Sequence, residues 1–168
     1  FEVVKFKQTN ESVGIDLGIK DFVITSDGLV YENKHFFKNQ EKKIKKLQRF
    51  LSKKVKGSNN RDKARIKLAK AFEKLTNQKE AYIHYVVNDL LRYYDIIFME
   101  DLNVQGMLKN HKLAKAIQEV GFYRFKSILL DKSINNGKRV VFIDRFYPSS
   151  KTCHNCEYVN KELTLNDR

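Results

Sequence analysis

The chain has 168 residues and carries 33 Lys and Arg against 20 Asp and Glu, a formal net charge of +13. This length suits one domain with a real core, and 42% hydrophobic residues exclude general disorder. No segment approaches the roughly 18 apolar residues of a membrane span, and two cysteines fit a reducing cytoplasm. The excess of positive charge indicates a polyanionic partner, most commonly nucleic acid. Without an apolar span, no membrane partner is expected.

The first third of the chain predicts three short strands. Residues 12–18 alternate strictly, with Val13, Ile15 and Leu17 on one face. Residues 21–26 form a second strand, and the Asp27-Gly28 pair is a strong hairpin-turn signal before residues 29–32. We therefore expect an antiparallel three-stranded meander.

The pattern changes to helix at residue 41. Apolar residues recur at spacings of three and four at Ile44, Leu47, Leu51 and Val55. Residues 56–60 interrupt this pattern, with Asn60 as the expected N-cap of a second helix over 61–93. Two helices joined by a short polar loop predict an antiparallel helical hairpin.

Positive charge is concentrated in this hairpin. Residues 41–74 hold 14 Lys or Arg and only 3 Asp or Glu. A solvated helix surface is the plain alternative, but such surfaces mix charges of both signs, so the run favours a polyanion-binding face. The expected nucleic-acid contacts are Lys42, Lys43, Lys45, Lys46, Arg49, Lys53, Lys54, Lys56, Arg61, Lys63, Arg65, Lys67, Lys70 and, outside the hairpin, Lys151.

The second half of the chain predicts a β-α-β unit. Residues 96–99 form a buried strand that ends in Glu100-Asp101, and residues 113–134 form one helix with Leu113, Ile117 and Val120 on its buried face. Asn136-Gly137 ends this helix before a buried strand over 139–143. The whole order predicts an α/β fold whose sheet has parallel and antiparallel strands.

Two carboxylates stand out on these strands. Asp16 lies mid-strand between Gly14 and Gly18 on its own face, although strands disfavour Asp. Glu100 ends a buried strand, a common position for site residues in α/β folds, whereas the neighbouring Asp101 is expected to serve the turn. A solvent-facing role is the alternative for both. Paired carboxylates in a basic protein suggest Mg²⁺ or Mn²⁺, although such sites usually need three, and no convincing third is present.

Cys153 and Cys156 form a CxxC pair near the end of the chain. One such pair supplies two of the four ligands of a zinc ribbon, so we expect half a ribbon. A redox motif is the first alternative, but it normally opens an amphipathic helix, and residues 157–166 lack that pattern. Inert cysteines are the second alternative.

Three motifs occur in a specific order: GIDLGIK at 14–20, FMEDLNV at 98–104, and DRFYPSSKTCHNC at 144–156, with the basic hairpin between the first two. This order closely resembles the TnpB/OrfB proteins of insertion sequences, relatives of the type V CRISPR effector nucleases. The resemblance implies a ribonuclease H-like (RuvC) domain in two halves, residues 1–40 and 95–147. Residues 41–94 would be the inserted hairpin and 148–168 a partial zinc ribbon.

The resemblance also implies roles for individual residues. Asp16 and Glu100 would be the first and second catalytic carboxylates that hold Mg²⁺, and Cys153 and Cys156 the first pair of zinc ligands. Such proteins are prokaryotic RNA-guided DNA endonucleases, in which the guide reads the sequence and the hairpin would lie against the guide–target duplex.

The family's third catalytic Asp and second CxxC are expected beyond Arg168, so the chain as given is expected to be catalytically incomplete, with Zn²⁺ bound only in the complete protein.

Other readings remain open. The leading alternative is a non-catalytic nucleic-acid-binding remnant or regulator. A Gly-Ile-Asp-Leu-Gly strand also occurs in actin-like ATPases, but Ile19-Lys20 and the short chain argue against that class. A junction resolvase would share the fold without explaining the CxxC pair.

Overall fold

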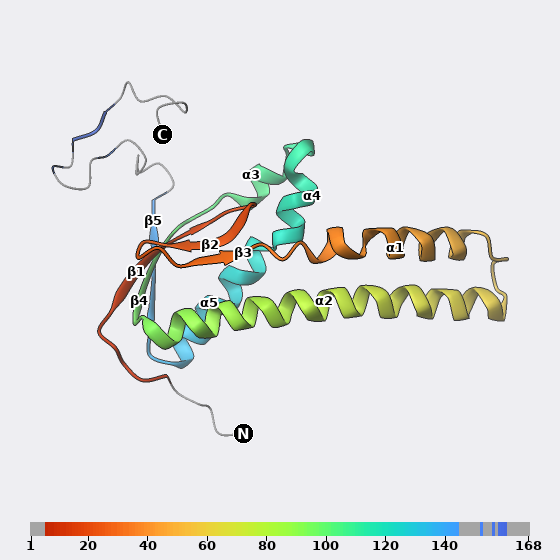
Figure 1. Cartoon of the computed structure of the whole chain (residues 1–168), viewed down its shortest axis with the longest axis horizontal. Helices are drawn as coiled ribbons and strands as arrows, with labels where there is room; N and C mark the ends of the chain where they lie inside the picture. The colour runs from red at the N-terminus through yellow and green to blue at the C-terminus, as the bar shows by residue number, and fades with distance from the viewer. Residues whose placement is uncertain (1–5, 145–151, 153–155, 157, 161–168) are drawn as a thin grey trace.

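A five-stranded mixed sheet forms the centre of the molecule, with strand order β3-β2-β1-β4-β5 (Figure 1). The computed structural model describes residues 6–144, 152, 156 and 158–160. Strands β1 (Ser12–Leu17), β2 (Asp21–Thr25) and β3 (Val30–Glu32) pair antiparallel. Strands β4 (Ile96–Glu100) and β5 (Arg139–Ile143) extend the sheet in parallel with β1. The predicted meander and mixed α/β sheet are confirmed.

Two long helices make a hairpin that extends away from the sheet (Figure 1). These are α1 (Phe36–Ser52) and α2 (Asn59–Tyr93). Between β4 and β5 lie three further helices, α3 (Val104–Leu108), α4 (His111–Val120) and α5 (Phe122–Asn135). In the part of the chain that the structure describes, no helix combines the length and apolarity needed to cross a membrane.

The bounds of the hairpin helices differ from those expected. Helix α1 begins at Phe36 rather than at 41 and ends at Ser52, which leaves Val55 76% exposed in the linker instead of on the buried stripe. The N-cap of α2 is Ser58, not Asn60, because the Ser58 hydroxyl accepts a hydrogen bond from the Arg61 N–H at 3.2 Å. The helical hairpin itself is confirmed, and only its ends move.

The single helix expected over 113–134 is wrong. It is divided into α4 and α5 at Gly121, whose φ of +78° is left-handed and cannot continue a helix. The side chain of Leu113 is 43% exposed and does not share the buried face of Ile117. Helix α3 was not predicted; it is short and begins where the Asn103 side chain accepts from the Gly106 N–H at 2.9 Å.

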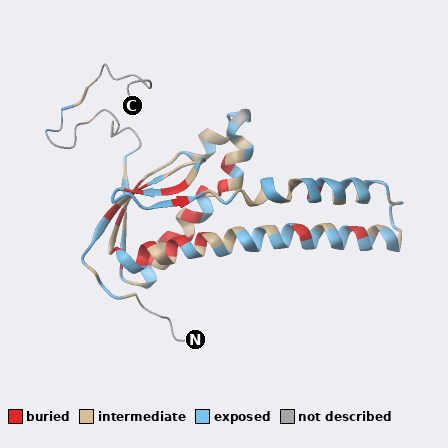
Figure 2. Ribbon diagram, in the orientation of Figure 1, coloured by how far each residue is buried: buried red, intermediate tan, exposed pale blue. Residues whose placement is uncertain are grey.

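The core lies between one face of the sheet and the helices α2 and α5. Val13 and Ile97 from the sheet, Leu90 from α2 and Phe125 and Leu129 from α5 are all at most 2% exposed. Burial of each such side chain contributes about 1.5–3 kcal/mol. Figure 2 shows the buried residues gathered in this region, whereas the far half of the hairpin is largely exposed. Burial therefore anchors the base of the hairpin and leaves its outer half to solvent.

Candidate functional site

Asp16 and Glu100 lie at neighbouring positions on adjacent strands. Strands β1 and β4 are parallel and in register, with Gly14 opposite Phe98 and Ile15 opposite Met99. One residue further along each strand are Asp16 and Glu100, so the two backbones are about 4.8 Å apart at this point. Both residues belong to the face opposite the core, because Ile15 and Met99 before them are buried. The structure thus brings the two predicted carboxylates together.

The backbone around Asp16 is shaped by close contacts. The Asp16 side chain is exposed, and among the described residues nothing hydrogen-bonds or pairs with its carboxylate. A Cβ atom on Gly18 would lie 2.7 Å from the carbonyl oxygen of Asp21, so only glycine fits the turn from β1 to β2. Gly14, on the same face as Asp16, has ordinary space, since a Cβ there would lie 3.6 Å from the Cβ of Ser26. Of these two glycines, only Gly18 lies where a side chain would not fit.

Glu100 is the last residue of β4, and Asp101 follows it outside the strand. Glu100 is half-buried and opposes Ile143 of β5. The carboxylate of Asp101, a residue expected to serve the turn, pairs with Nζ of Lys126 on α5 at 2.7 Å. A pocket of about 250 Å³ opens at this edge, and its walls include Leu17, Glu100 and Lys126. The ion pair ties the end of β4 to α5, which restrains the backbone at Glu100.

A further carboxylate lies at the same sheet edge. Asp144 follows β5 directly and is exposed. It was not predicted as a site residue, although, like Glu100, it lies at the end of a strand. Across residues 6–144 and the few described positions beyond, no three His, Cys, Asp or Glu side chains are grouped so that they could hold a metal ion. The described candidate centre therefore consists of two carboxylates.

The predicted zinc ligands are only partly described. Cys153 and Lys151 lie outside the described residues. Cys156 is exposed with a free thiol, between Thr152 and Val159, which form an isolated antiparallel bridge. The pairing of Cys153 with Cys156 stays a prediction.

The predicted basic residues are spread along both helices of the hairpin. Those on α1 (Lys42, Lys43, Lys45, Lys46 and Arg49) and most of those on α2 (Lys63, Arg65, Lys67 and Lys70) are exposed. Lys53, Lys54 and Lys56 lie at the end of α1 and in the linker. Arg61 differs, because its guanidinium donates to the carbonyl oxygens of Leu51 and Lys54 at 3.3 and 3.1 Å. Arg61 thus holds the hairpin turn together.

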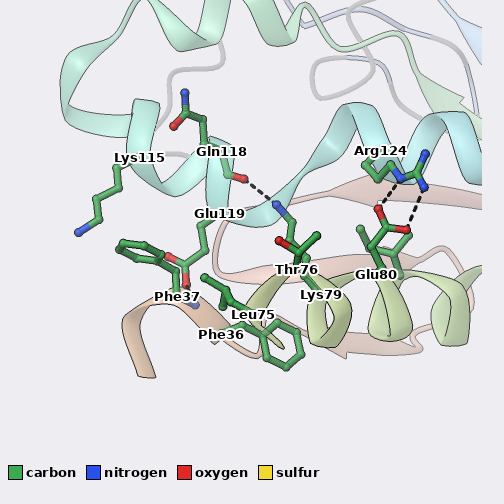
Figure 3. A pocket seen from close by; sticks show the side chains of 11 residues that line it. Phe36, Phe37, Leu75, Thr76, Lys79, Glu80, Lys115, Gln118, Glu119 and Arg124 are labelled. Carbon is green, nitrogen blue, oxygen red and sulfur yellow. Dashed lines mark hydrogen bonds and ion pairs between the residues drawn. The ribbon is translucent and has the colours of Figure 1, made fainter. Parts of the chain in front are cut away.

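The base of the hairpin is fixed to α4 and α5 by polar contacts around a pocket of about 330 Å³. Figure 3 shows Lys79 of α2 pointing at α4, where Nζ donates to the carbonyl oxygen of Gln118 at 2.7 Å. The guanidinium of Arg124 on α5 donates two hydrogen bonds, of 2.6 and 2.9 Å, to the carboxylate of Glu80 on α2. Phe36 contributes an apolar wall. These contacts set the direction in which the hairpin leaves the body.

Two carboxylates are held in their charged form at the joint where the base of the hairpin meets α4 and α5. Hydrogen bonds from Lys115 and then Lys45 lower the pKa of Glu41 to about 2. The Arg124 hydrogen bonds lower the pKa of Glu80. Burial lowers the pKa of Lys79, so this amine is partly removed from water. The joint is therefore an ionic cluster, which sequence spacing alone did not indicate.

Two protein-family models and several known proteins match the sequence of this chain. A family model described as "Probable transposase" of the OrfB, IS605 type matches residues 2–111, and one described as the "Cas12f1-like, TNB domain" matches residues 122–168. The chain is 38% identical over 95% of its length to a Streptomyces pristinaespiralis protein named "Putative RNA-guided DNA endonuclease". It is 30% identical over 91% of its length to InsQ of Escherichia coli K12, which carries the same description.

The chain corresponds to less than half of the length of each of these relatives. The chain spans 40% of the Streptomyces protein and 42% of InsQ, and 30% of a TnpB-like mimivirus protein that is 28% identical. Among solved structures, the chain of the cryo-EM Cas12f1-sgRNA-target DNA complex is similar, with a TM-score of 0.60 and 15% identity. That likeness covers 99% of this chain and 35% of the other. It concerns the fold alone.

Proposed function

Because the chain belongs to the OrfB family of IS605 probable transposases, we propose that it is the central part of a TnpB-type RNA-guided DNA endonuclease. The proposed fold is a RuvC-type, ribonuclease H-like domain with the hairpin as an insertion. The names of the relatives favour this function over a non-catalytic regulator. The proposed reaction is hydrolysis of a DNA phosphodiester at a site directed by a guide RNA, in a prokaryotic cytoplasm.

The observation that carries the proposal is the placement of Asp16 beside Glu100. Parallel register puts both carboxylates on the face of the sheet opposite the core, at the carboxyl end of β4. Strand ends of this kind are where α/β proteins hold their ligands. The exposed Asp16 carboxylate remains open to a ligand, since no described side chain neutralises it.

These two side chains fit a hard divalent cation in kind, because carboxylate oxygens are the ligands that Mg²⁺ and Mn²⁺ prefer. Asp16 and Glu100 would hold the ion, and a third protein ligand would come from outside the described residues. When bound, such an ion activates water and stabilises the leaving oxygen of a phosphodiester. The Gly18 turn and the Asp101–Lys126 pair would keep the two carboxylates in position.

The basic hairpin would supply affinity for nucleic acid without reading its sequence. Lysine and arginine contacts to phosphates give binding that weakens steeply with salt, while base pairing with the guide would read the target. Lys151, next to the CxxC pair, is proposed as a further contact, and Cys153 with Cys156 as half of a zinc ribbon.

The test is duplex DNA cleavage by the full-length gene product with its guide RNA and Mg²⁺. We expect Asp16→Asn and Glu100→Gln each to abolish cleavage while binding of DNA and RNA stays nearly intact. The matched control is Glu32→Gln, an exposed carboxylate on β3 away from the proposed centre, which should cleave normally. Undiminished cleavage by Asp16→Asn would sink the assignment.

A second readout separates metal binding from activity. Titration of the chain with Mn²⁺, followed by electron paramagnetic resonance, should show weak binding that both variants reduce and Glu32→Gln does not. Cleavage that is absent from the wild-type full-length product, with nucleic-acid binding retained, would favour the non-catalytic alternative.

A further inference from the structure

One face of α1 forms an open groove with an unusual composition. The groove, of about 540 Å³, is lined by Lys42, Lys45, Lys46, Arg49, Phe50 and Lys53. Five of its six lining residues are cations and none is acidic, so the groove has a strongly positive potential. The sixth is a phenyl ring. This combination of cations and a ring restricts the class of ligand more than the positive charge of the hairpin alone does.

Most of the groove's cations are available to a ligand. Among the described residues, only Lys45 of the five has an acidic partner, with Nζ 3.0 Å from Glu41. Glu41 is shared with Lys115 of α4, so it neutralises Lys45 incompletely. Lys42, Lys46, Arg49 and Lys53 have no carboxylate partner within residues 6–144. The groove therefore needs an anion with several negative charges spaced along its length.

Phe50 is presented to solvent instead of packing into the hairpin. Its side chain is 45% exposed, whereas Ile44 on the same helix is 2% exposed and faces α2. The Nζ atom of Lys54 lies 4.3 Å from the centre of the ring, a cation–π contact that restrains it. A restrained, half-exposed aromatic ring among cations is the arrangement on which an unpaired base stacks.

We propose that this groove is a binding site for a single-stranded nucleic-acid segment, with phosphates held by the cations and a base stacked on Phe50. A duplex would satisfy the cations but would leave Phe50 unused, because its bases are already stacked on one another. From Lys42 to Lys53 the groove extends about 16 Å along the helix at about 1.5 Å per residue. That length spans about five phosphates at the roughly 3.4 Å spacing of a stacked strand, and fewer phosphates of an extended single strand.

The inference rests on the proposed function, since it names the form of nucleic acid that the groove on α1 takes. The probes are mixed-sequence oligonucleotides of about 15 nucleotides, one RNA and one DNA, and a DNA duplex of equal length. Binding to the chain is followed by fluorescence anisotropy at several salt concentrations. Comparing the affinities for the RNA and the DNA oligonucleotide shows which kind of single strand the groove prefers.

The decisive variants are Phe50→Leu, which keeps apolar volume without an aromatic face, and Phe50→Tyr, which keeps the ring. We expect Phe50→Leu to weaken single-strand binding about 5- to 150-fold, with an unchanged salt slope because no charge is lost. Phe50→Tyr should bind as the wild type does, and duplex binding should change less than twofold in both.

Phe72→Leu is the matched control, because Phe72 is a 37% exposed ring on α2 of the same hairpin and outside the groove. It should leave single-strand binding unchanged. Unaltered binding by Phe50→Leu, or an equal loss for Phe72→Leu or for the duplex, overturns the inference while leaving the proposed function standing. If the wild-type chain binds neither form of nucleic acid, this inference and the proposed function are both contradicted.

Discussion

The carboxylate of Glu119 near the end of α4 accepts a hydrogen bond from the backbone N–H of Phe37, 82 residues earlier in the chain, at 3.1 Å. The same oxygen accepts from the Lys38 N–H at 3.2 Å. Helix α1 has no cap of its own, because His35 before it is left-handed and its side chain makes no capping hydrogen bond. A side chain from another helix therefore satisfies the free amides that begin α1, and its negative charge suits that end of a helix.

Glu119→Ala should lower the free energy of unfolding by about 1 kcal/mol, as loss of an N-cap does. Glu119→Gln, which keeps an acceptor oxygen but no charge, should lower it less. Urea unfolding followed by circular dichroism measures both. The matched control is Gln118→Ala, because Lys79 uses only the backbone carbonyl of Gln118. Equal stability of Glu119→Ala and the wild type would show that water caps α1 equally well.

Gly18→Ala should destabilise the chain by about 1–3 kcal/mol, the usual cost of forcing an atom into an occupied space. The added Cβ would meet the carbonyl oxygen of Asp21 at 2.7 Å, and neither backbone segment can yield without moving the turn. Gly14→Ala is the control on the same strand, where the nearest contact is an ordinary 3.6 Å. Thermal unfolding of the two variants should separate them; similar melting temperatures would contradict the role of Gly18.

The stability contributed by Glu41 should depend on pH. Lys115 and Lys45 lower the pKa of Glu41 in the folded state to about 2, against an ordinary value of 4.5. The charged form is favoured by folding, so this contribution is full above about pH 4.5 and is lost as pH falls towards 2. The difference in melting temperature between wild type and Glu41→Gln should therefore shrink over this interval.

The control for that experiment is Glu73→Gln, an exposed glutamate on α2 outside the joint. Its difference from wild type should stay small throughout. A Glu41→Gln difference that stays constant from pH 6 to pH 2 would mean that the ion pairs with Lys115 and Lys45 do not couple to folding.

Replacing Lys42, Lys43, Lys45 and Lys46 by Gln should weaken duplex DNA binding and flatten its dependence on salt. Each phosphate contact contributes about 0.9 to the slope of log K against log salt, so the slope should fall by up to about 3–4. The control removes the same charge at the exposed Lys7, Lys20, Lys34 and Lys109, away from the outer hairpin. An unchanged slope in the first variant would make α1 an ordinary solvated helix.

Local pattern was enough to predict much of the fold. The alternation over residues 12–18 and the Asp27-Gly28 turn predicted β1 to β3, and short apolar runs predicted β4 and β5. These signals work because side chains alternate across a strand whatever lies beside it. Helix ends were harder: α1 begins early because its cap comes from Glu119, and Gly121 breaks a helix inside an apolar pattern that looked continuous.

The sequence by itself determined which residues are proposed to carry the chemistry: Asp16 on a strand, Glu100 at a strand end, and the excess of cations on one hairpin. Only the tertiary structure decided that Asp16 and Glu100 are neighbours, that Arg61 holds a turn, and that Phe50 stands among the cations of a groove. The reason is physical. Periodicity assigns a residue to a face of its own element, whereas strand register and helix packing depend on contacts between residues far apart in the chain.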